Sequence, residues 1–290
     1  QKIYFISNKE TIFENRFYSI NFDGSDLKLL TKEPGMHSIK MFPNNDGFID
    51  SYSSIDTPTR HLLKNVNGKT ILVLKETNKS QFEAYDWTYP KIIKFKSTDG
   101  KQMLDGIVTY PPNYKKGVRY PVIVHGYGMP GTQIVYNRWG STWNQYLAHQ
   151  GYIVFSMDAR GMSGRGEDFK NLSYGDMSKY LSKDTAAGVR HLIDKGDVDP
   201  DRVGAWGWSG GGYFTGLMLT KNADLFDVGV SVAPVMDFRL YDTIYTERSM
   251  GLPQDNKAGY DSTSVLTYVD RFNGKLLVMH GTGDDNVHSQ

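Results

Sequence analysis

The pattern of hydrophobic and polar positions divides the chain into two parts with different periods. Up to about Glu76, short segments alternate apolar and polar residues, as half-buried strands do. These segments are KIYFIS (2–7), RFYSINF (16–22), LKLLT (27–31), GFIDSYSS (47–54), TRHLLKNV (59–66) and TILVLKE (70–76). The turn signals Asp23-Gly24, Asp46-Gly47 and Asn67-Gly68 separate several of them. The pattern predicts an antiparallel, all-β meander.

A meander of this size leaves its sheet edges open, because roughly seventy-five residues supply only one or two sheets. Such a unit is normally one blade among several. We therefore expect that the sequence begins inside a larger β architecture.

After a linker at 78–90 the pattern changes. Apolar runs such as PVIVH (121–125), YIVFSMD (152–158) and KLLVMH (275–280) alternate with helix-like stretches such as SKDTAAGVRHLIDKG (182–196). This alternation predicts an α/β domain with a doubly wound, mostly parallel sheet. The expected domains are residues 1–77 and 78–290.

Charge and composition exclude several classes of function. The chain has 33 Lys and Arg against 32 Asp and Glu, a net charge of +1, and no block of like charge. Nucleic acid is therefore not an expected partner. No apolar run approaches the roughly 18 residues that span a bilayer, and no cysteine is present for disulfide or thiolate chemistry.

One short motif carries candidate chemistry. Gly207-Trp208-Ser209-Gly210-Gly211 fits G-x-S-x-G, the nucleophile elbow of α/β-hydrolases, and lies between the apolar strand 203–206 and a plausible helix at 213–220. A strand that turns sharply into a helix needs residues without a Cβ around the turn. The turn would expose the Ser209 hydroxyl to a base and to outward-pointing backbone N–H groups.

Two other motifs compete with this interpretation. Gly126 to Gly131 matches the dinucleotide fingerprint G-x-G-x-x-G after a strand, with Asp158 at the end of the next strand. However, Pro130-Gly131 and a polar stretch delay the helix that this fingerprint needs. A metal could be bound by His280, Asp284, Asp285 and His288, although an Asp-rich turn often only satisfies backbone donors. We expect neither a cofactor nor a metal.

Four motifs together resemble the prolyl oligopeptidase family of serine peptidases, in its dipeptidyl peptidase IV branch. They are GWSGGGY around Ser209, DARGMSGRG (158–166), VAPVMDFRLYDTIYTERSMGLP (232–253) and HGTGDDNVH (280–288). The resemblance implies an eight-bladed propeller followed by an α/β-hydrolase domain. Residues 1–77 would then be the last propeller blades, which accounts for the open meander.

The resemblance also implies the site residues. Ser209 would be the nucleophile and Asp284 the triad acid, while the Tyr127 hydroxyl and the Gly210 backbone N–H would bind the oxyanion. An apolar, aromatic box for a proline before the cut bond would consist of Val235, Phe238, Tyr241, Tyr245 and Val287. Asn286 would bind a substrate carbonyl.

The sequence departs from this branch at two positions. Gly210 stands where dipeptidyl peptidase IV has a tyrosine, and Ser249 replaces an aromatic residue near the pocket. The amide at position 210 survives, but one side of the proline pocket should be barer, which weakens a strict preference for proline.

The general base is not apparent in the sequence. In this family the histidine follows the acid by a few tens of residues, and none of the seven histidines before Gln290 suits the role. His288 follows Asp284 on the same loop and should point away from the serine. We expect that the chain is incomplete, that the base lies beyond Gln290, and that these residues alone lack triad catalysis.

The expected activity is that of a serine exopeptidase that releases dipeptides with proline or alanine at the second position. A tripeptidyl or acylaminoacyl peptidase of the same family, or a non-catalytic binding relative, is the alternative. The expected partner is a peptide substrate, and relatives in this family are commonly exported and dimeric, which implies a periplasmic or extracellular homodimer.

Overall fold

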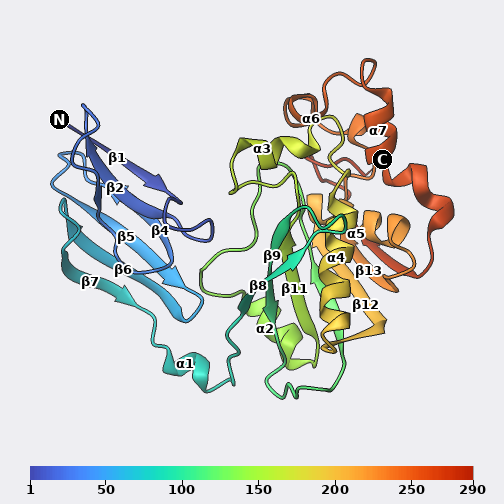
Figure 1. Cartoon of the computed structure of the whole chain (residues 1–290), viewed down its shortest axis with the longest axis horizontal. Helices are drawn as coiled ribbons and strands as arrows, with labels where there is room; N and C mark the ends of the chain where they lie inside the picture. The colour runs from blue at the N-terminus through green and yellow to red at the C-terminus, as the bar shows by residue number, and fades with distance from the viewer. Residues whose placement is uncertain (290) are drawn as a thin grey trace. The chain divides into compact units, whose positions relative to one another are not determined.

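The computed structural model describes residues 1–289 as two compact units (Figure 1). One unit contains residues 1–90 and 136–145, and the other contains residues 91–135 and 146–290. The short segment 136–145 therefore leaves the larger unit. Its Asn137 side chain donates to Glu14 (2.7 Å) and accepts from the backbone N–H of Ile55 (3.0 Å).

The smaller unit contains two antiparallel sheets. The first has the order β1-β2-β3 and the second β4-β5-β6-β7. The strands are β1 (Lys2–Ser7), β2 (Arg16–Asn21), β3 (Lys28–Leu29), β4 (Met36–Met41), β5 (Gly47–Ser54), β6 (Thr57–Asn65) and β7 (Thr70–Glu76). Phe17, Leu30 and Phe48 form the buried apolar cluster of this unit. The predicted meander is confirmed, and the linker carries one short helix, α1 (Ser80–Glu83).

Strand β4 was not predicted, because its buried position is polar. His37 is the fully buried side chain in this strand, and its ring contacts the Asp50 carboxylate at 2.9 Å. Lys64 contacts the same carboxylate at 3.0 Å. A buried ionic cluster of this kind does not produce the apolar alternation by which strands are recognised.

The larger unit is built on a seven-stranded sheet with the order β14-β13-β12-β10-β11-β9-β8. Its strands are β8 (Lys91–Lys96), β9 (Met103–Thr109), β10 (Tyr120–His125), β11 (Ile153–Asp158), β12 (Val198–Trp208), β13 (Val228–Val232) and β14 (Lys275–Met279). Strands β10 to β14 pair in parallel, whereas β8 and β9 are antiparallel. The predicted doubly wound, mostly parallel sheet is confirmed.

The helices between and after these strands are α2 (Thr142–His149), α3 (Glu167–Lys170), α4 (Leu181–Asp194), α5 (Gly210–Lys221), α6 (Thr243–Met250) and α7 (Lys257–Thr263). Of these, α4 and α5 pack on the sheet. Helix α5 is buried from Gly210 to Thr220 and packs on β12 and β13, with α4 beside it. The predicted helix at 213–220 therefore begins three residues earlier, directly after Ser209.

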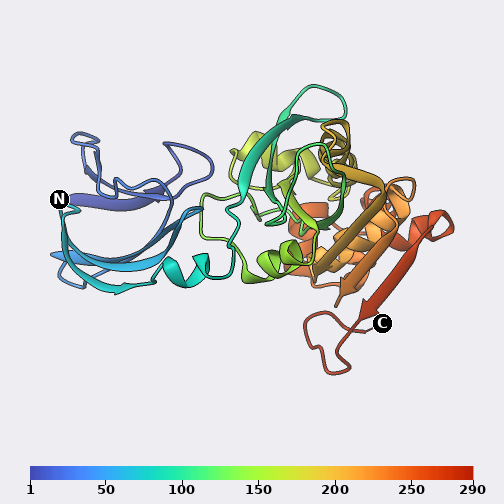
Figure 2. The same cartoon turned by 90° about the horizontal axis from the view of Figure 1, so that it is seen from below.

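Strand β14 lies at the open edge of the sheet (Figure 2). Within the described residues, every residue from Lys275 to Met279 is exposed. The pairing of β14 with β13 is nevertheless regular and parallel.

Candidate active site

A strained turn holds Ser209 between β12 and α5. Its φ of 58° and ψ of −117° lie in a region that residues with a Cβ rarely adopt. The backbone N–H of Ser209 donates to the Val232 carbonyl at 2.8 Å, and its carbonyl accepts from Tyr213 at 3.0 Å. The turn is thus held from β13 and from inside α5, while the side chain stays partly exposed.

The glycine before the turn is required by close backbone contact. A Cβ on Gly207 would lie 2.5 Å from the Gly211 carbonyl oxygen and 2.6 Å from that of Gly126. Real Cβ atoms do not approach a backbone oxygen so closely, so a side chain here would push β12 away from the start of α5. The sequence GWSGGG is therefore shaped by packing at this corner.

The Ser209 hydroxyl has no hydrogen-bond partner within residues 1–289. Several of the described histidines are engaged elsewhere: for example, His125 stacks on Trp206 at 4.4 Å, and His191 stacks on Phe95 at 6.0 Å. His280 uses its Nε2 atom to donate to the Val287 carbonyl at 2.7 Å. The structure thus brings no histidine of the described chain to the nucleophile.

Asp284 lies on the loop that follows β14, at the same end of the parallel strands as Ser209. Trp208, Val232 and Met279 are in register across β12, β13 and β14. Because neighbouring strands are about 4.8 Å apart, the chain leaves β12 and β14 at points roughly 10 Å from each other. A side chain that bridges this gap could contact both Ser209 and the acid.

The environment of Asp284 keeps its carboxylate ionised. One oxygen, Oδ1, accepts from the backbone N–H groups of Val287 (2.9 Å) and Asn286 (3.1 Å). These two hydrogen bonds lower the pKa of Asp284 below its ordinary value. The other oxygen lies 3.7 Å from Nε2 of His280. An ionised acid in a fixed turn is suited to orienting and stabilising an imidazolium.

Tyr127 and Gly210 lie next to each other at this corner. A Cβ on Gly210 would come within 3.2 Å of Cε1 and Cζ of the Tyr127 ring, so the ring faces the start of α5. As the first residue of α5, Gly210 has no acceptor for its N–H inside the helix. The Tyr127 ring therefore lies beside the first residue of α5, which follows Ser209; a phenol and an amide are the kinds of donor that an oxyanion site needs.

Most of the predicted proline box forms one aromatic row. The ring of Tyr241 lies 6.3 Å from Phe238 and 6.1 Å from Tyr245, in edge-to-face geometry in both cases. Phe238 is 3% exposed and packs on Tyr213, so it serves the core as well.

Three of the predicted substrate residues share a hollow beside this row. Val235, Tyr241 and Val287 line a hollow of about 270 Å³ together with His280. The Tyr241 hydroxyl donates to Oδ1 of Asn286 at 3.4 Å. Phe238 and Tyr245 do not line this hollow, but the aromatic row connects them to Tyr241.

Tyr245 connects the box to the loop that carries Tyr127. Its hydroxyl donates to the Pro130 carbonyl at 3.1 Å. Burial raises the pKa of Tyr245 well above its ordinary value, so the phenol stays protonated and remains a donor. The loop that carries Tyr127 and helix α6 are thus joined by a hydrogen bond.

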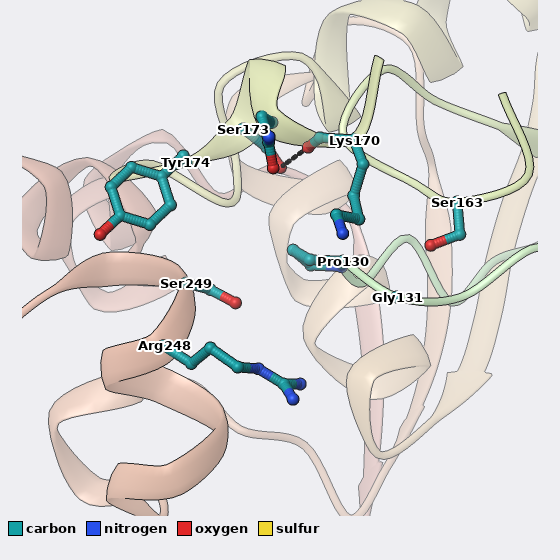
Figure 3. A pocket seen from close by; sticks show the side chains of 9 residues that line it. Pro130, Gly131, Ser163, Lys170, Ser173, Tyr174, Arg248 and Ser249 are labelled. Atoms are coloured by element: carbon teal, nitrogen blue, oxygen red, sulfur yellow. Dashed lines mark hydrogen bonds between the residues drawn. The ribbon is translucent and has the colours of Figure 1, made fainter. Parts of the chain in front are cut away.

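A second hollow is lined by Pro130 and Gly131 of the loop after β10 (Figure 3). It has a volume of about 430 Å³, and Lys170 and Arg248 extend into it from different elements. Ser249, which stands where the related branch has an aromatic residue, also lines it. Lys170 is paired with Glu167 at 2.6 Å.

The geometry does not favour the nucleotide interpretation. After the glycine run that starts at Gly126, the next helix, α2, begins only at Thr142, so no helix begins inside this glycine run as the fingerprint requires. The Asp158 carboxylate accepts from the backbone N–H groups of Ile134 and Val135 and pairs with Arg165. The Asp158 carboxylate is therefore already bonded to groups of the protein itself.

The described residues contain neither a metal-binding cluster nor a membrane-spanning helix. Over residues 1–289, no group of three or more His, Asp or Glu side chains is arranged to hold a metal ion. In the same range, no helix is both long enough and apolar enough to cross a membrane.

Sequence reasoning missed two residues at this site. Met129 packs directly against Gly210, and His280 pins the loop that carries Asp284. Gly210 is a sequence signal for the contact with Met129, because a glycine often marks the place where another group approaches closely. No sequence signal identified the hydrogen bond of His280.

Comparison with known proteins matches both parts of the chain. A model of the prolyl oligopeptidase family matches residues 139–290, and a model of the dipeptidyl peptidase IV N-terminal region matches residues 1–59. The chain is 35% identical to "Probable dipeptidyl-aminopeptidase B" of Emericella nidulans, over 99% of the chain and 33% of that protein. It is 34% identical to the protein of the same name from Botryotinia fuckeliana, over 99% of the chain and 32% of that protein.

A solved structure shares the fold. Dipeptidyl peptidase 4 of Porphyromonas gingivalis superposes with a TM-score of 0.94 at 31% identity, over 99% of this chain and 41% of that chain. The expected fold is confirmed: an α/β-hydrolase sheet is preceded by antiparallel sheets of a propeller region. The chain spans about a third of the length of the curated relatives it matches.

Proposed function

Because the chain belongs to the prolyl oligopeptidase family, we propose that it is part of a serine exopeptidase that releases dipeptides from the free amino ends of peptides. The observation that carries the proposal is the strained, partly exposed turn at Ser209, with Tyr127 and the Gly210 amide beside it. The names of the relatives, dipeptidyl-aminopeptidase B and dipeptidyl peptidase 4, support the dipeptidyl product.

In the proposed reaction, Ser209 Oγ attacks the carbonyl carbon of the bond to be cut. A histidine outside residues 1–289 takes the hydroxyl proton and gives it to the leaving amine. Asp284 orients this histidine and stabilises its charged form. The negative oxygen of the tetrahedral intermediate accepts from the Tyr127 hydroxyl and the Gly210 N–H. Water then hydrolyses the acyl-enzyme by the same steps, and the serine regains its proton.

The residue before the cut bond would be proline or alanine. Proline has a rigid ring and no N–H, so an apolar aromatic box selects it by shape. The row of Phe238, Tyr241 and Tyr245 supplies flat apolar faces, and Val235 and Val287 supply aliphatic ones. Asn286, hydrogen-bonded to Tyr241, would bind a carbonyl of the substrate.

The proposal is tested on the full-length protein with chromogenic Gly-Pro and Gly-Ala substrates, and with the same dipeptides carrying a blocked amino end. We expect release from the free dipeptides and not from the blocked ones. A fluorophosphonate probe should label the wild type but not Ser209→Ala, while Ser163→Ala, a change at another partly exposed serine, should label normally. Turnover of only blocked or longer peptides would remove the dipeptidyl proposal.

A non-catalytic binding protein on the same fold is the second candidate. It would keep the sheet and the box but would leave Ser209 unreactive. The strain at Ser209 argues against this candidate, because such a conformation costs of order 1–3 kcal/mol and persists mainly at functional sites. Absence of fluorophosphonate labelling in the full-length protein would favour it.

A further inference from the structure

The space beside the residue that follows the nucleophile is already filled. A Cβ on Gly210 would lie 2.5 Å from Cγ of Met129, although real Cβ atoms essentially never approach a neighbour within 3.0 Å. Met129 is 3% exposed, and it comes from the loop after β10, not from α5. Met129 therefore occupies the space that a side chain at position 210 would enter.

Met129 cannot easily move aside, because its turn is fixed on both sides. Its carbonyl accepts from the Thr132 hydroxyl at 2.6 Å and from the Thr132 N–H at 3.2 Å. The next carbonyl, that of Pro130, accepts from Tyr245. The conflicting atom is Cγ, close to the backbone, so a rotation of the thioether end alone would not relieve the contact.

We propose that Met129 is a specificity-determining residue of the site, and that its side chain takes over the wall that residue 210 would otherwise provide. This inference rests on the proposed function. It follows that Gly210 and Met129 are a matched pair: a side chain at position 210 requires a small residue at 129. It also follows that a residue on the loop after β10 sets the preference of the enzyme for the substrate residue before the cut bond.

The chemistry of the thioether indicates the substrate class. Methionine is unbranched and polarisable and adapts to different shapes, whereas an aromatic ring at position 210 would be a flat, rigid wall. A wall of this kind accepts proline and also alanine and other small apolar residues. We expect the wild type to prefer Gly-Pro over Gly-Ala by only about tenfold, the discrimination that small apolar differences support.

The test is a double-mutant cycle in the full-length protein with Gly210→Ala, Met129→Ala and the combination of both. The single Gly210→Ala change should lower kcat/KM on Gly-Pro by about a hundredfold, because the new Cβ displaces Met129 or Tyr127. The double variant should recover at least about tenfold of this loss. As a matched control, Met177→Ala, at another buried methionine, should give no recovery with Gly210→Ala.

A second cycle tests specificity with Gly210→Tyr and Met129→Gly. Gly210→Tyr alone should be poorly folded or inactive, and adding Met129→Gly should restore activity. The ratio of kcat/KM for Gly-Pro to that for Gly-Ala should then rise about tenfold above the wild-type ratio. A ratio within twofold of the wild type would overturn the specificity role, and failure of both doubles to recover would overturn the pairing.

The failure of this inference can be distinguished from the failure of the proposed function. If the wild type releases no dipeptide, the proposed function fails, and the pairing is then measured by fluorophosphonate labelling of Ser209 and by the thermal midpoint. Labelling rate and midpoint should both show the same rescue of Gly210→Ala by Met129→Ala. Additive losses in both readouts would overturn the inference without any reference to peptide turnover.

Discussion

The backbone N–H of Ser209 donates a 2.8 Å hydrogen bond to the carbonyl of Val232. The next residue, Ala233, in turn donates to the carbonyl of Met279 at 2.7 Å. These two bonds continue the ladder of the sheet past the ends of β12 and β13. The turn at Ser209 and the start of the loop that carries Asp284 are therefore fixed to one another through the backbone of β13.

Removal of the Tyr127 hydroxyl should impair the chemical step more than substrate binding. Its ring faces the start of α5, where the charge of the intermediate would develop. In the full-length protein, Tyr127→Phe should lower kcat by about a hundred- to a thousandfold with little change in KM. The control is Tyr241→Phe, which removes the 3.4 Å hydrogen bond to Asn286 and should mainly raise KM. Equal effects of both changes on KM would contradict the oxyanion role.

The pH dependence of activity should not report the ionisation of Asp284. Backbone hydrogen bonds from Val287 and Asn286 lower its pKa below the unfolded value of roughly 3.9. Ionised Asp284 therefore contributes to the stability of the fold, and this contribution is fully present above the unfolded pKa. The stability is lost as the pH falls through the lowered pKa of the folded state. The acidic limb of kcat/KM should lie near the histidine value of about 6.5.

An apparent pKa near 4 on that limb would contradict this assignment. Asp284→Asn provides the matching change, because its side-chain oxygen can still accept from Asn286 and Val287 and keep the loop folded. It should lower kcat by about four orders of magnitude, as loss of a triad acid does. A loss of less than tenfold would remove Asp284 from the triad.

A methyl group at Gly207 should destabilise the protein, because it would press on two backbone oxygens. The added Cβ would lie 2.5 Å from the Gly211 carbonyl oxygen and 2.6 Å from the Gly126 carbonyl oxygen. Both are backbone atoms, so they cannot move aside as the end of a flexible side chain can. Gly207→Ala should lower the free energy of unfolding by about 1–3 kcal/mol. Gly283→Ala, where a Cβ would meet nothing within 4 Å, should change it by less than about 0.5 kcal/mol. Denaturant unfolding monitored by tryptophan fluorescence measures both, and equal effects would disprove the packing argument.

His280 should act as a positioning residue for the acid loop. Its Nε2 atom donates to the Val287 carbonyl at 2.7 Å, seven residues along the chain. His280→Ala should cost about 1 kcal/mol of stability, the usual worth of a hydrogen bond. It should also lower kcat/KM about tenfold by loosening Asp284 and Val287. His288→Ala, at an exposed histidine of the same loop, is the control and should leave both quantities nearly unchanged.

The sequence by itself determined the class of each element wherever period and burial agreed. The strands around the elbow and the antiparallel first part follow from apolar runs and alternation, and G-x-S-x-G located the turn at Ser209. It failed at β4, where the buried residue is a histidine that is hydrogen-bonded to the Asp50 carboxylate. There, burial depends on neighbours that are distant in sequence.

Only the tertiary structure decided which residue forms the wall beside Gly210. The sequence predicted a bare side at this position, because a glycine carries no side chain. The fold brings Met129, from a different loop, into that space, since β10 and β12 are adjacent strands and their following loops meet at one edge. Contacts between loops that follow neighbouring parallel strands are set by strand order, and strand order is not encoded in any local pattern.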